Sequence, residues 1–194
     1  MIKLHLGCGK NYMKDYINID IISNIADIKI DINDLSLYET ESVDEIYASH
    51  VLEHFKLIQL PVLLKEWNRV LKKNGLLRIA VPDFDSCVKY YTETNKLDDI
   101  LGLLYGGQKN EYDLHYVIYN FDILSKLLNG FGFNNIVRYD SELFLKDNDD
   151  YSKSYLPHLN KNGKLMSLNI ICNKYTNDIN LNDTILTRKK HSSV

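Results

Sequence analysis

Short apolar runs of strand length alternate along this chain with longer segments of helical periodicity, and this alternation constrains the fold more than any other feature. Such a pattern is typical of α/β domains, in which helices cover both faces of a mostly parallel sheet. With 194 residues, the chain is about one domain's worth at roughly 100–200 residues per domain, so we expect one open sheet. Seven runs are predicted to be its strands: Lys3–Leu6, Ile17–Ile21, Asp27–Ile30, Val43–Ala48, Leu76–Val81, Asn135–Tyr139 and Leu165–Cys172.

Two segments show clear helical periodicity. Leu60–Lys72 places its apolar residues on one face, and Phe121–Asn129 follows Asn120, a favourable N-cap residue. Both helices are expected to pack on the sheet. Between Asp83 and Gly107 the apolar residues have mixed spacing, and this region is predicted to form an irregular helical cover over the functional site.

Composition and charge restrict the class of partner and the compartment. The formal net charge is −3, which gives no reason to expect a nucleic acid as partner, because polynucleotide ligands usually require a strongly basic face. Three cysteines, Cys8, Cys87 and Cys172, form neither a disulfide framework nor a zinc motif, so a reducing compartment is expected. No run approaches the ~20 apolar residues of a membrane span, and a strand beginning by Ile2 leaves no room for a signal peptide. We therefore expect a cytoplasmic protein.

The two ends of the chain have different character. Residues 1–174 contain all the predicted elements and are expected to form the domain. Residues 175–194 are rich in Asn and Asp and end on a basic cluster, a composition that buries too little apolar surface to offset the entropy of ordering. This segment is predicted to be a disordered tail.

A glycine-rich turn follows the first predicted strand. Lys3–Leu6 leads into Gly7-Cys8-Gly9, where two residues lack a Cβ atom and allow a ligand close to the backbone. Asp20 lies near the end of the next strand, where its carboxylate could accept both hydroxyl groups of a ribose. A dinucleotide fingerprint would need a third glycine at position 12, which is Tyr12 here. The pattern therefore favours a nucleoside-containing ligand other than a dinucleotide.

Four stretches together carry a family resemblance: LHLGCGKNY, YINID, SVDEIYASHVLEHF and LLKEWNRVLKKNGLLRIAVPDF. In this order they resemble the class I S-adenosylmethionine-dependent methyltransferases, and most of all a small bacterial type with a short GCG loop. The resemblance covers Met1 to about Asp85, with a weaker signature over His115–Tyr139. It implies a Rossmann-like fold that binds S-adenosylmethionine. One departure is that only about nine residues link the first two strands, too few for the usual crossover helix.

The resemblance implies roles for residues at the ends of the first four predicted strands. Asp20 would bind the ribose of the cofactor, and Ile21 would touch the face of the adenine. Asp31 and Ile32 would read the adenine amino group and ring. The residues that would contact the methionine portion or lie beside the sulfonium are Gly7, Cys8, Gly9, Ser49 and His50.

Histidine can take a proton from a hydroxyl or amine acceptor, so His50 and His115 are the candidate catalytic residues, with packing or helix initiation as the alternative. The string from His50 to His54 also resembles the E-x-x-E-H metal site of small-RNA 2′-O-methyltransferases and some ubiquinone-pathway O-methyltransferases. The first Glu of that motif is replaced here by His. Because L-E-H also opens a helix in methyltransferases that look metal-free, no metal is assigned.

The resemblance implies transfer of a methyl group from S-adenosylmethionine to an oxygen or nitrogen of a small-molecule or saccharide acceptor, by a monomer or homodimer. Two alternatives remain open. The chain could bind the cofactor as a catalytically silent regulatory or assembly protein. It could also be an NAD- or nucleotide-sugar-dependent enzyme that uses the same type of sheet.

Overall fold

The computed structural model describes residues 1–145, 150–157 and 162–175. Its centre is a six-stranded sheet in the order β2-β1-β3-β4-β8-β5, in which β2, β1, β3 and β4 run parallel and β8 runs antiparallel to both its neighbours. This mostly parallel α/β sheet confirms the predicted fold class. The strands are β1 (Lys3–Leu6), β2 (Ile17–Ile19), β3 (Val43–Ser49), β4 (Leu71–Pro82), β5 (Phe133–Arg138) and β8 (Ser167–Lys174).

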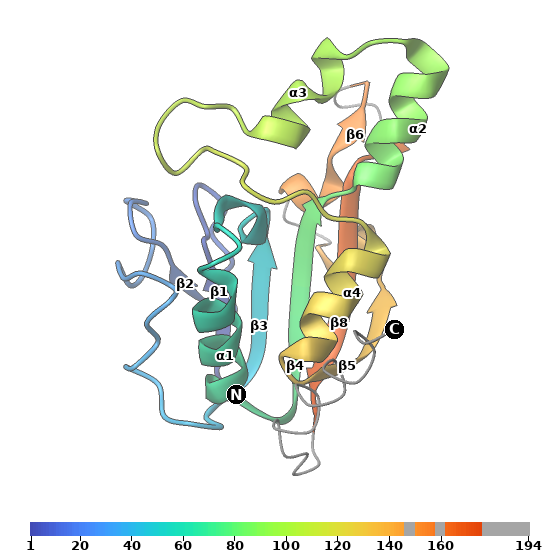
Figure 1. Ribbon diagram of the computed structural model, residues 1–194. Coiled ribbons are helices and arrows are strands. Elements are labelled where there is room, and N and C mark those ends of the chain that lie inside the picture. The colour runs from blue at the N-terminus through green and yellow to red at the C-terminus, as the bar shows by residue number, and fades with distance from the viewer. Residues whose placement is uncertain (146–149, 158–161, 176–194) are drawn as a thin grey trace, which may run out of the picture.

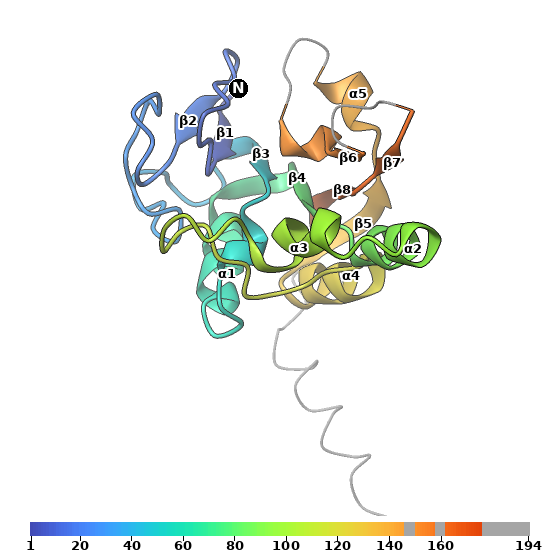
Figure 2. The same ribbon diagram turned by 90° about the horizontal axis from the view of Figure 1, so that it is seen from above.

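The helices surround this sheet unevenly (Figures 1 and 2). The two longest packed against it, α1 and α4, lie on the same face, and α2 and α3 lie beyond the carboxyl end of β4. The opposite face carries only short elements. The helices and remaining strands are η1 (Leu52–His54), α1 (Leu60–Val70), α2 (Phe84–Thr94), α3 (Asp98–Tyr105), α4 (Phe121–Gly130), α5 (Ser141–Phe144), η2 (Tyr151–Lys153), β6 (Tyr155–Leu156) and β7 (Lys164–Leu165). Within the described ranges, none of these helices has both the length and the apolar character to cross a bilayer.

The prediction of seven strands in one sheet was wrong, because Asp27–Ile30 forms a single bridge between Ile28 and Ile19. The physical reason is a competing hydrogen bond. The backbone N–H of Asn18 donates to the Asp27 carboxylate at 2.7 Å, and the Asn18 side-chain amide donates to the same oxygen at 3.0 Å. The Asn18 N–H, at the free edge of β2, is thereby bound to a side chain, whereas a further strand would have to accept it with a main-chain oxygen.

Helices lie on both faces, as predicted, but the helix on the second face is short. Residues 7–16, between β1 and β2, contain no helix, as the short crossover predicted. The second face is covered by this loop and by α5, which pack with Tyr47 of β3 to form a small separate core of Met13, Tyr16, Tyr47, Phe144 and Leu145. A loop and a four-residue helix thus cover this face.

The main core lies between the sheet and the face that carries α1 and α4. Helix α1 buries Leu63, Leu64 and Trp67 completely, and the Trp67 indole N–H donates to the backbone oxygen of Ile32 at 3.1 Å. Helix α4 begins as predicted, because the Asn120 side chain accepts the backbone N–H of Ile123 at 3.0 Å. The sequence periodicity therefore identified both packed helices, although α1 ends two residues before the expected Lys72.

An ion pair on α1 holds the loop that precedes β3. Arg69 and Glu66 form two hydrogen bonds of 2.7 and 2.8 Å, and the Glu66 carboxylate also accepts the backbone N–H of Leu35 at 2.9 Å. Arg69 donates in turn to the backbone oxygens of Leu35 and Tyr38. The Arg69 guanidinium holds the pKa of Glu66 below its usual value, and the Leu35 N–H acts in the same direction.

The low pKa of Glu66 predicts a pH-dependent contribution to stability. Its contribution is complete above the unfolded-state pKa of about 4.3 and is lost as the pH falls through the lower folded-state pKa. We expect Glu66→Gln to lower the free energy of unfolding at pH 7, and the difference from wild type to shrink below about pH 4. Urea denaturation from pH 7 to pH 3 measures this difference, with exposed Glu39→Gln as control. A difference that does not change with pH would contradict the prediction.

Candidate functional site

The turn after β1 is held in a conformation that favours glycine. Gly7 and Gly9 have φ angles of +66° and +54°, and the N–H groups of Gly7 and Cys8 both donate to the oxygen of Ile19, at 2.8 and 3.2 Å. A Cβ atom added to Gly7 would lie 2.4 Å from a methyl carbon of Val51, whereas one added to Gly9 would meet no atom within 4 Å. The turn therefore packs tightly at Gly7 and is open at Gly9.

Asp20 contacts this turn directly. Its Oδ2 accepts the backbone N–H of Gly9 at 2.9 Å, and its Oδ1 accepts those of Ile22 and Ser23 at 2.9 and 2.8 Å. The Ser23 hydroxyl donates to the backbone oxygen of Gly9. The structure thus brings together the predicted glycine turn and the predicted carboxylate.

Cys8 lies between these glycines and is buried. Burial raises the pKa of its thiol to about 11, and the neighbouring Asp20 carboxylate adds to the shift. The thiol is therefore protonated at neutral pH and is a poor nucleophile, because the thiolate is the reactive form. Cys8 therefore contributes to the turn through the packing of its buried side chain and through its backbone groups.

The residues predicted to contact adenine are spread over different environments. Ile21 is exposed directly after Asp20, where an aromatic ligand could cover it. Asp31 is exposed, and its Oδ1 accepts the backbone and side-chain N–H groups of Asn33, both at 2.9 Å. Ile32 belongs to the main core. The structure leaves Ile21 and Asp31 accessible, but most of the Ile32 side chain is already buried by protein.

The end of β3 presents Ser49 and His50. The Oγ atom of Ser49 is buried and has no hydrogen-bond partner among the described residues. His50 has a φ angle of +53°, unusual for a residue with a side chain, and its N–H donates to the oxygen of Ala80 at 2.8 Å. Its Nε2 lies 3.0 Å from the Ser167 hydroxyl oxygen, and its Nδ1 lies 3.3 Å from Oε1 of Glu53. Both imidazole nitrogens therefore have polar neighbours.

Glu53, in η1, is the charged centre of this region. It is fully buried, yet neither carboxylate oxygen has a hydrogen-bond partner among the described residues, since the 3.3 Å contact with His50 lacks hydrogen-bond alignment. Burial alone would raise its pKa, but the adjacent His50, reinforced by His54 and His115, outweighs burial and lowers it. Glu53 is thus a buried carboxylate surrounded by imidazoles.

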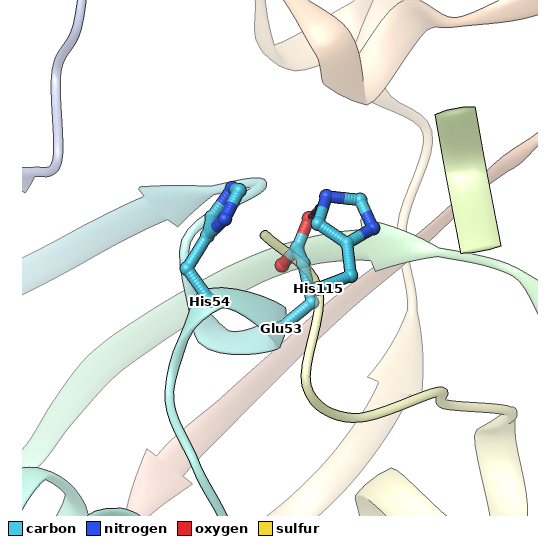
Figure 3. A group of neighbouring side chains, drawn as sticks. All are labelled: Glu53, His54 and His115. Carbon is cyan, nitrogen blue, oxygen red and sulfur yellow. Dashed lines mark ion pairs between the residues drawn. The ribbon is translucent and has the colours of Figure 1, made fainter. Parts of the chain in front are cut away.

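His115 comes from the chain after α3 and reaches the same place. Its Nε2 lies 4.0 Å from Oε1 of Glu53, and its ring centroid lies 4.8 Å from that of His54. Figure 3 shows the Glu53 carboxylate between the two rings. Burial lowers the pKa of His115, which favours its neutral form. The two candidate catalytic histidines, His50 and His115, therefore both lie near Oε1 of one carboxylate.

Sequence reasoning missed the importance of Glu53 and the presence of Ser167. Glu53 was visible in the His50–His54 string but could equally have opened a helix on the surface. Ser167 begins β8, 117 positions after His50, and no local signal connects the two. Its hydroxyl also lies 3.2 Å from Oδ1 of Asn169, so the antiparallel strand supplies polar neighbours to the end of β3.

Helices α2 and α3 form the predicted helical region between Asp83 and Gly107. The Asp83 side chain caps α2 by accepting the N–H of Asp85 at 3.2 Å. The chain after α3 is tied back to it, because His115 donates its backbone N–H to Tyr105 at 3.2 Å. This arrangement places His115 at the carboxyl ends of the central strands.

Comparisons with known proteins agree with this architecture. Residues 4–79 match the family model described as a methyltransferase domain. No sequence among curated proteins matches the chain. The sheet and its helices resemble those of many solved structures.

A SAM-dependent methyltransferase from Archaeoglobus fulgidus is 16% identical, with a TM-score of 0.54 over 89% of this chain and 85% of the other. One from Methanosarcina mazei is 17% identical, with a TM-score of 0.54 over 90% and 92%. The 1,6-didemethyltoxoflavin-N1-methyltransferase of Burkholderia thailandensis, solved with bound 1,6-didemethyltoxoflavin and S-adenosylhomocysteine, is 14% identical, with a TM-score of 0.56 over 90% of this chain and 71% of the other. At these sequence identities, the similarity shows a shared fold and no more.

Proposed function

We propose that this chain is a class I S-adenosylmethionine-dependent methyltransferase that methylates an oxygen or nitrogen atom of a small-molecule or saccharide acceptor. The observation that carries the proposal is the contact between Gly9 and Asp20 at the carboxyl ends of β1 and β2. Ligands of open α/β sheets bind at this edge, and Ser49 and His50 end the neighbouring strand β3 there.

The residues at this edge fit an adenosyl ligand. The open side of Gly9 allows close approach to the backbone, which an added side chain would fill. A carboxylate has about four acceptor positions, and Asp20 uses three of them for backbone N–H groups, which leaves capacity for a ribose hydroxyl. The buried Ser49 hydroxyl, which has no hydrogen-bond partner in the part of the chain that the structure describes, provides a further polar group. We assign Gly7, Cys8, Gly9, Asp20, Ile21, Asp31, Ile32 and Ser49 to the cofactor.

S-adenosylmethionine supplies a methyl group on a positively charged sulfur, so the chain's main task is to align the acceptor and exclude water. A lone pair of the acceptor forms the new bond to the methyl carbon while the carbon–sulfur bond breaks and its electrons stay on sulfur. A hydroxyl acceptor must also lose a proton. We assign its removal to His50, because Glu53 beside Nδ1 favours the proton on that nitrogen and leaves Nε2 basic. His115 is the second candidate.

Several properties of the chain support a small acceptor in the cytoplasm. The net charge of −3 gives no reason to expect the strongly basic face that a polynucleotide usually requires. All three cysteines are buried and free, which fits a reducing compartment. We infer a cytoplasmic monomer or homodimer in which residues 1–174 form the catalytic domain. The tail predicted over residues 175–194 lies, apart from Tyr175, outside the described residues.

Two measurements test the proposal. Calorimetry should detect S-adenosylhomocysteine binding, whereas NAD and UDP-sugars should give no heat of binding. Incubation with methyl-labelled S-adenosylmethionine and fractionated small metabolites should then transfer label to an acceptor. Binding without transfer to any fraction would favour a catalytically silent cofactor-binding protein. Binding of NAD or a UDP-sugar in place of S-adenosylhomocysteine would contradict the assignment.

The role of His50 gives a separate prediction. We expect His50→Ala to lower kcat about 10- to 100-fold for a hydroxyl acceptor, because the acceptor's proton loses its base. Affinity for S-adenosylhomocysteine should stay within about threefold of wild type, since His50 is assigned to the acceptor. Steady-state kinetics and calorimetry on the same preparation separate the two effects. Equal losses of turnover and affinity would place His50 in the cofactor site, and unchanged values would remove it from both.

A further inference from the structure

The buried carboxylate of Glu53 lacks a fully charged, hydrogen-bonded partner within the described part of the chain. Its carboxylate is fully buried, and neither oxygen meets the geometry of a hydrogen bond among the described residues, although Oε1 lies 3.3 Å from Nδ1 of His50. A buried carboxylate without partners is strongly unfavourable, so native proteins pair such groups with a cation or a metal ion. The buried Tyr119 hydroxyl also interacts with this charge but is itself neutral, because burial and Glu53 raise its pKa. The neighbouring groups that can carry a positive charge or bind a cation are the imidazoles of His50, His54 and His115. Whatever neutralises Glu53 must therefore lie among these rings.

Two of these rings are held in the orientation typical of metal ligands. Nδ1 of His54 lies 3.0 Å from the backbone oxygen of Leu114, and Nδ1 of His115 lies 2.9 Å from that of Leu103. A carbonyl oxygen only accepts, so Nδ1 must donate in both rings, and in the neutral form each Nε2 carries a lone pair. Histidines that bind metals usually donate their other ring nitrogen to a carbonyl or carboxylate in this way.

The distances suit a cation held between the three residues. One ligand atom from each of Glu53, His54 and His115 lies within 4.8 Å of the other two. Ligand atoms at about 2.0–2.2 Å from one ion are separated by roughly 3–4.4 Å, so the side chains need to draw only slightly closer. Nε2 of His115 is 4.0 Å from the Glu53 carboxylate, too far for a hydrogen bond between them.

The backbone holds these ligands in place from two directions. The N–H of Tyr116 donates to the backbone oxygen of Glu53 at 2.8 Å, which ties the segment that carries His115 to η1. The N–H of His115 donates to Tyr105 at the end of α3. Glu53 and His54 are adjacent in η1, so the three ligands come from two segments that hydrogen-bond to each other.

We propose that Glu53, His54 and His115 form a binding site for one divalent transition-metal cation, such as Zn²⁺ or Mn²⁺. One carboxylate and two imidazoles are a donor set suited to these ions, and three protein ligands leave coordination positions open. The cation neutralises the buried carboxylate and uses the imidazole lone pairs. Metal binding at this site does not depend on the proposed methyl transfer. Only a role for the cation in binding the methyl acceptor would depend on it.

Metal binding is tested on untagged protein, first freed of metal with EDTA and then dialysed. Zn²⁺ and Mn²⁺ titrations by calorimetry, with metal content by mass spectrometry, should give one cation per chain, and Co²⁺ should produce visible absorption bands of a nitrogen- and oxygen-ligated ion. We expect Glu53→Gln and His115→Gln each to weaken binding at least about tenfold. Glu45→Gln is the matched control, because Glu45 is a buried carboxylate paired with Arg78 at 2.7 Å and should leave metal binding unchanged.

Circular dichroism checks the fold of each variant, and His54→Gln serves if Glu53→Gln does not fold. Wild-type protein that binds no cation at millimolar concentration would overturn the proposal and leave a protonated imidazole as the partner of Glu53. Ligand variants that bind the cation as tightly as wild type would overturn it as well. S-adenosylhomocysteine binding, measured in EDTA, tests the proposed function separately, so failure of either one is recognised independently of the other.

Discussion

Replacing Asp20 with alanine is expected to weaken S-adenosylhomocysteine binding on the order of 100-fold or more, because hydrogen bonds to a charged group contribute about 1.5–3 kcal/mol each. The substitution removes the acceptor assigned to the ribose. It also removes the bond that holds the N–H of Gly9 at 2.9 Å, so the glycine turn loses its support at the same time. Calorimetric titration of the variant with S-adenosylhomocysteine measures the loss.

Two controls separate lost contacts from lost structure. Asp44→Ala removes a carboxylate from the opposite end of the sheet, where it pairs with Lys72 at 2.8 Å, and should leave affinity unchanged. Asp20 also accepts the N–H groups of Ile22 and Ser23, so its loss lowers stability, and binding must be measured well below the unfolding temperature. Asp20→Ala protein that is folded and binds as tightly as wild type would remove the cofactor site from this edge of the sheet.

Gly7→Ala is expected to lower the free energy of unfolding by about 2–5 kcal/mol. The φ angle of +66° costs an L-residue roughly 1–2 kcal/mol, and the new Cβ would lie 2.4 Å from Val51, which adds about 1–3 kcal/mol of overpacking. Because the turn must move to relieve the contact, affinity for S-adenosylhomocysteine should fall as well. Thermal unfolding followed by circular dichroism, together with calorimetry, measures both.

Two other glycines calibrate this result. Gly9→Ala has the strained φ angle of +54° but no neighbour within 4 Å, so it should lose only about 1–2 kcal/mol. Gly102→Ala, within α3 and also without close neighbours, should stabilise the protein by about 0.5–1 kcal/mol. If Gly7→Ala were no more destabilising than Gly9→Ala, the close contact with Val51 would have no energetic importance.

Much of the fold followed from local patterns. The periodicity of Leu60–Lys72 and the N-cap at Asn120 identified α1 and α4, because a buried helical face repeats its apolar residues whatever it packs against. The strand at Asp27–Ile30 could not be judged in this way. Its pairing depended on whether the N–H of Asn18 would meet a carbonyl or the Asp27 side chain, a choice between groups nine positions apart.

In the candidate site, too, some residues could be recognised from the sequence and others could not. The sequence identified Gly7, Gly9 and Asp20, because positive φ angles favour glycine and a carboxylate at the end of a strand is visible as an aspartate. The nature of Glu53 was not recognisable. From sequence alone, a glutamate after a strand is expected on the surface, whereas in the structure Glu53 is completely buried, with His115 from the chain beyond α3 at 4.0 Å.

By itself, the sequence determined the α/β class, the two packed helices and the turn at Gly7–Gly9, since each depends on residues that are neighbours along the chain. Only the tertiary structure decided that the sheet has six strands, that one face lacks long helices, and that a buried carboxylate lies among three histidines. The physical reason is that burial and electrostatic environment are set by segments distant in sequence. For example, His115, which lies near the Glu53 carboxylate in the folded chain, is 62 positions away from it in the sequence (115 − 53).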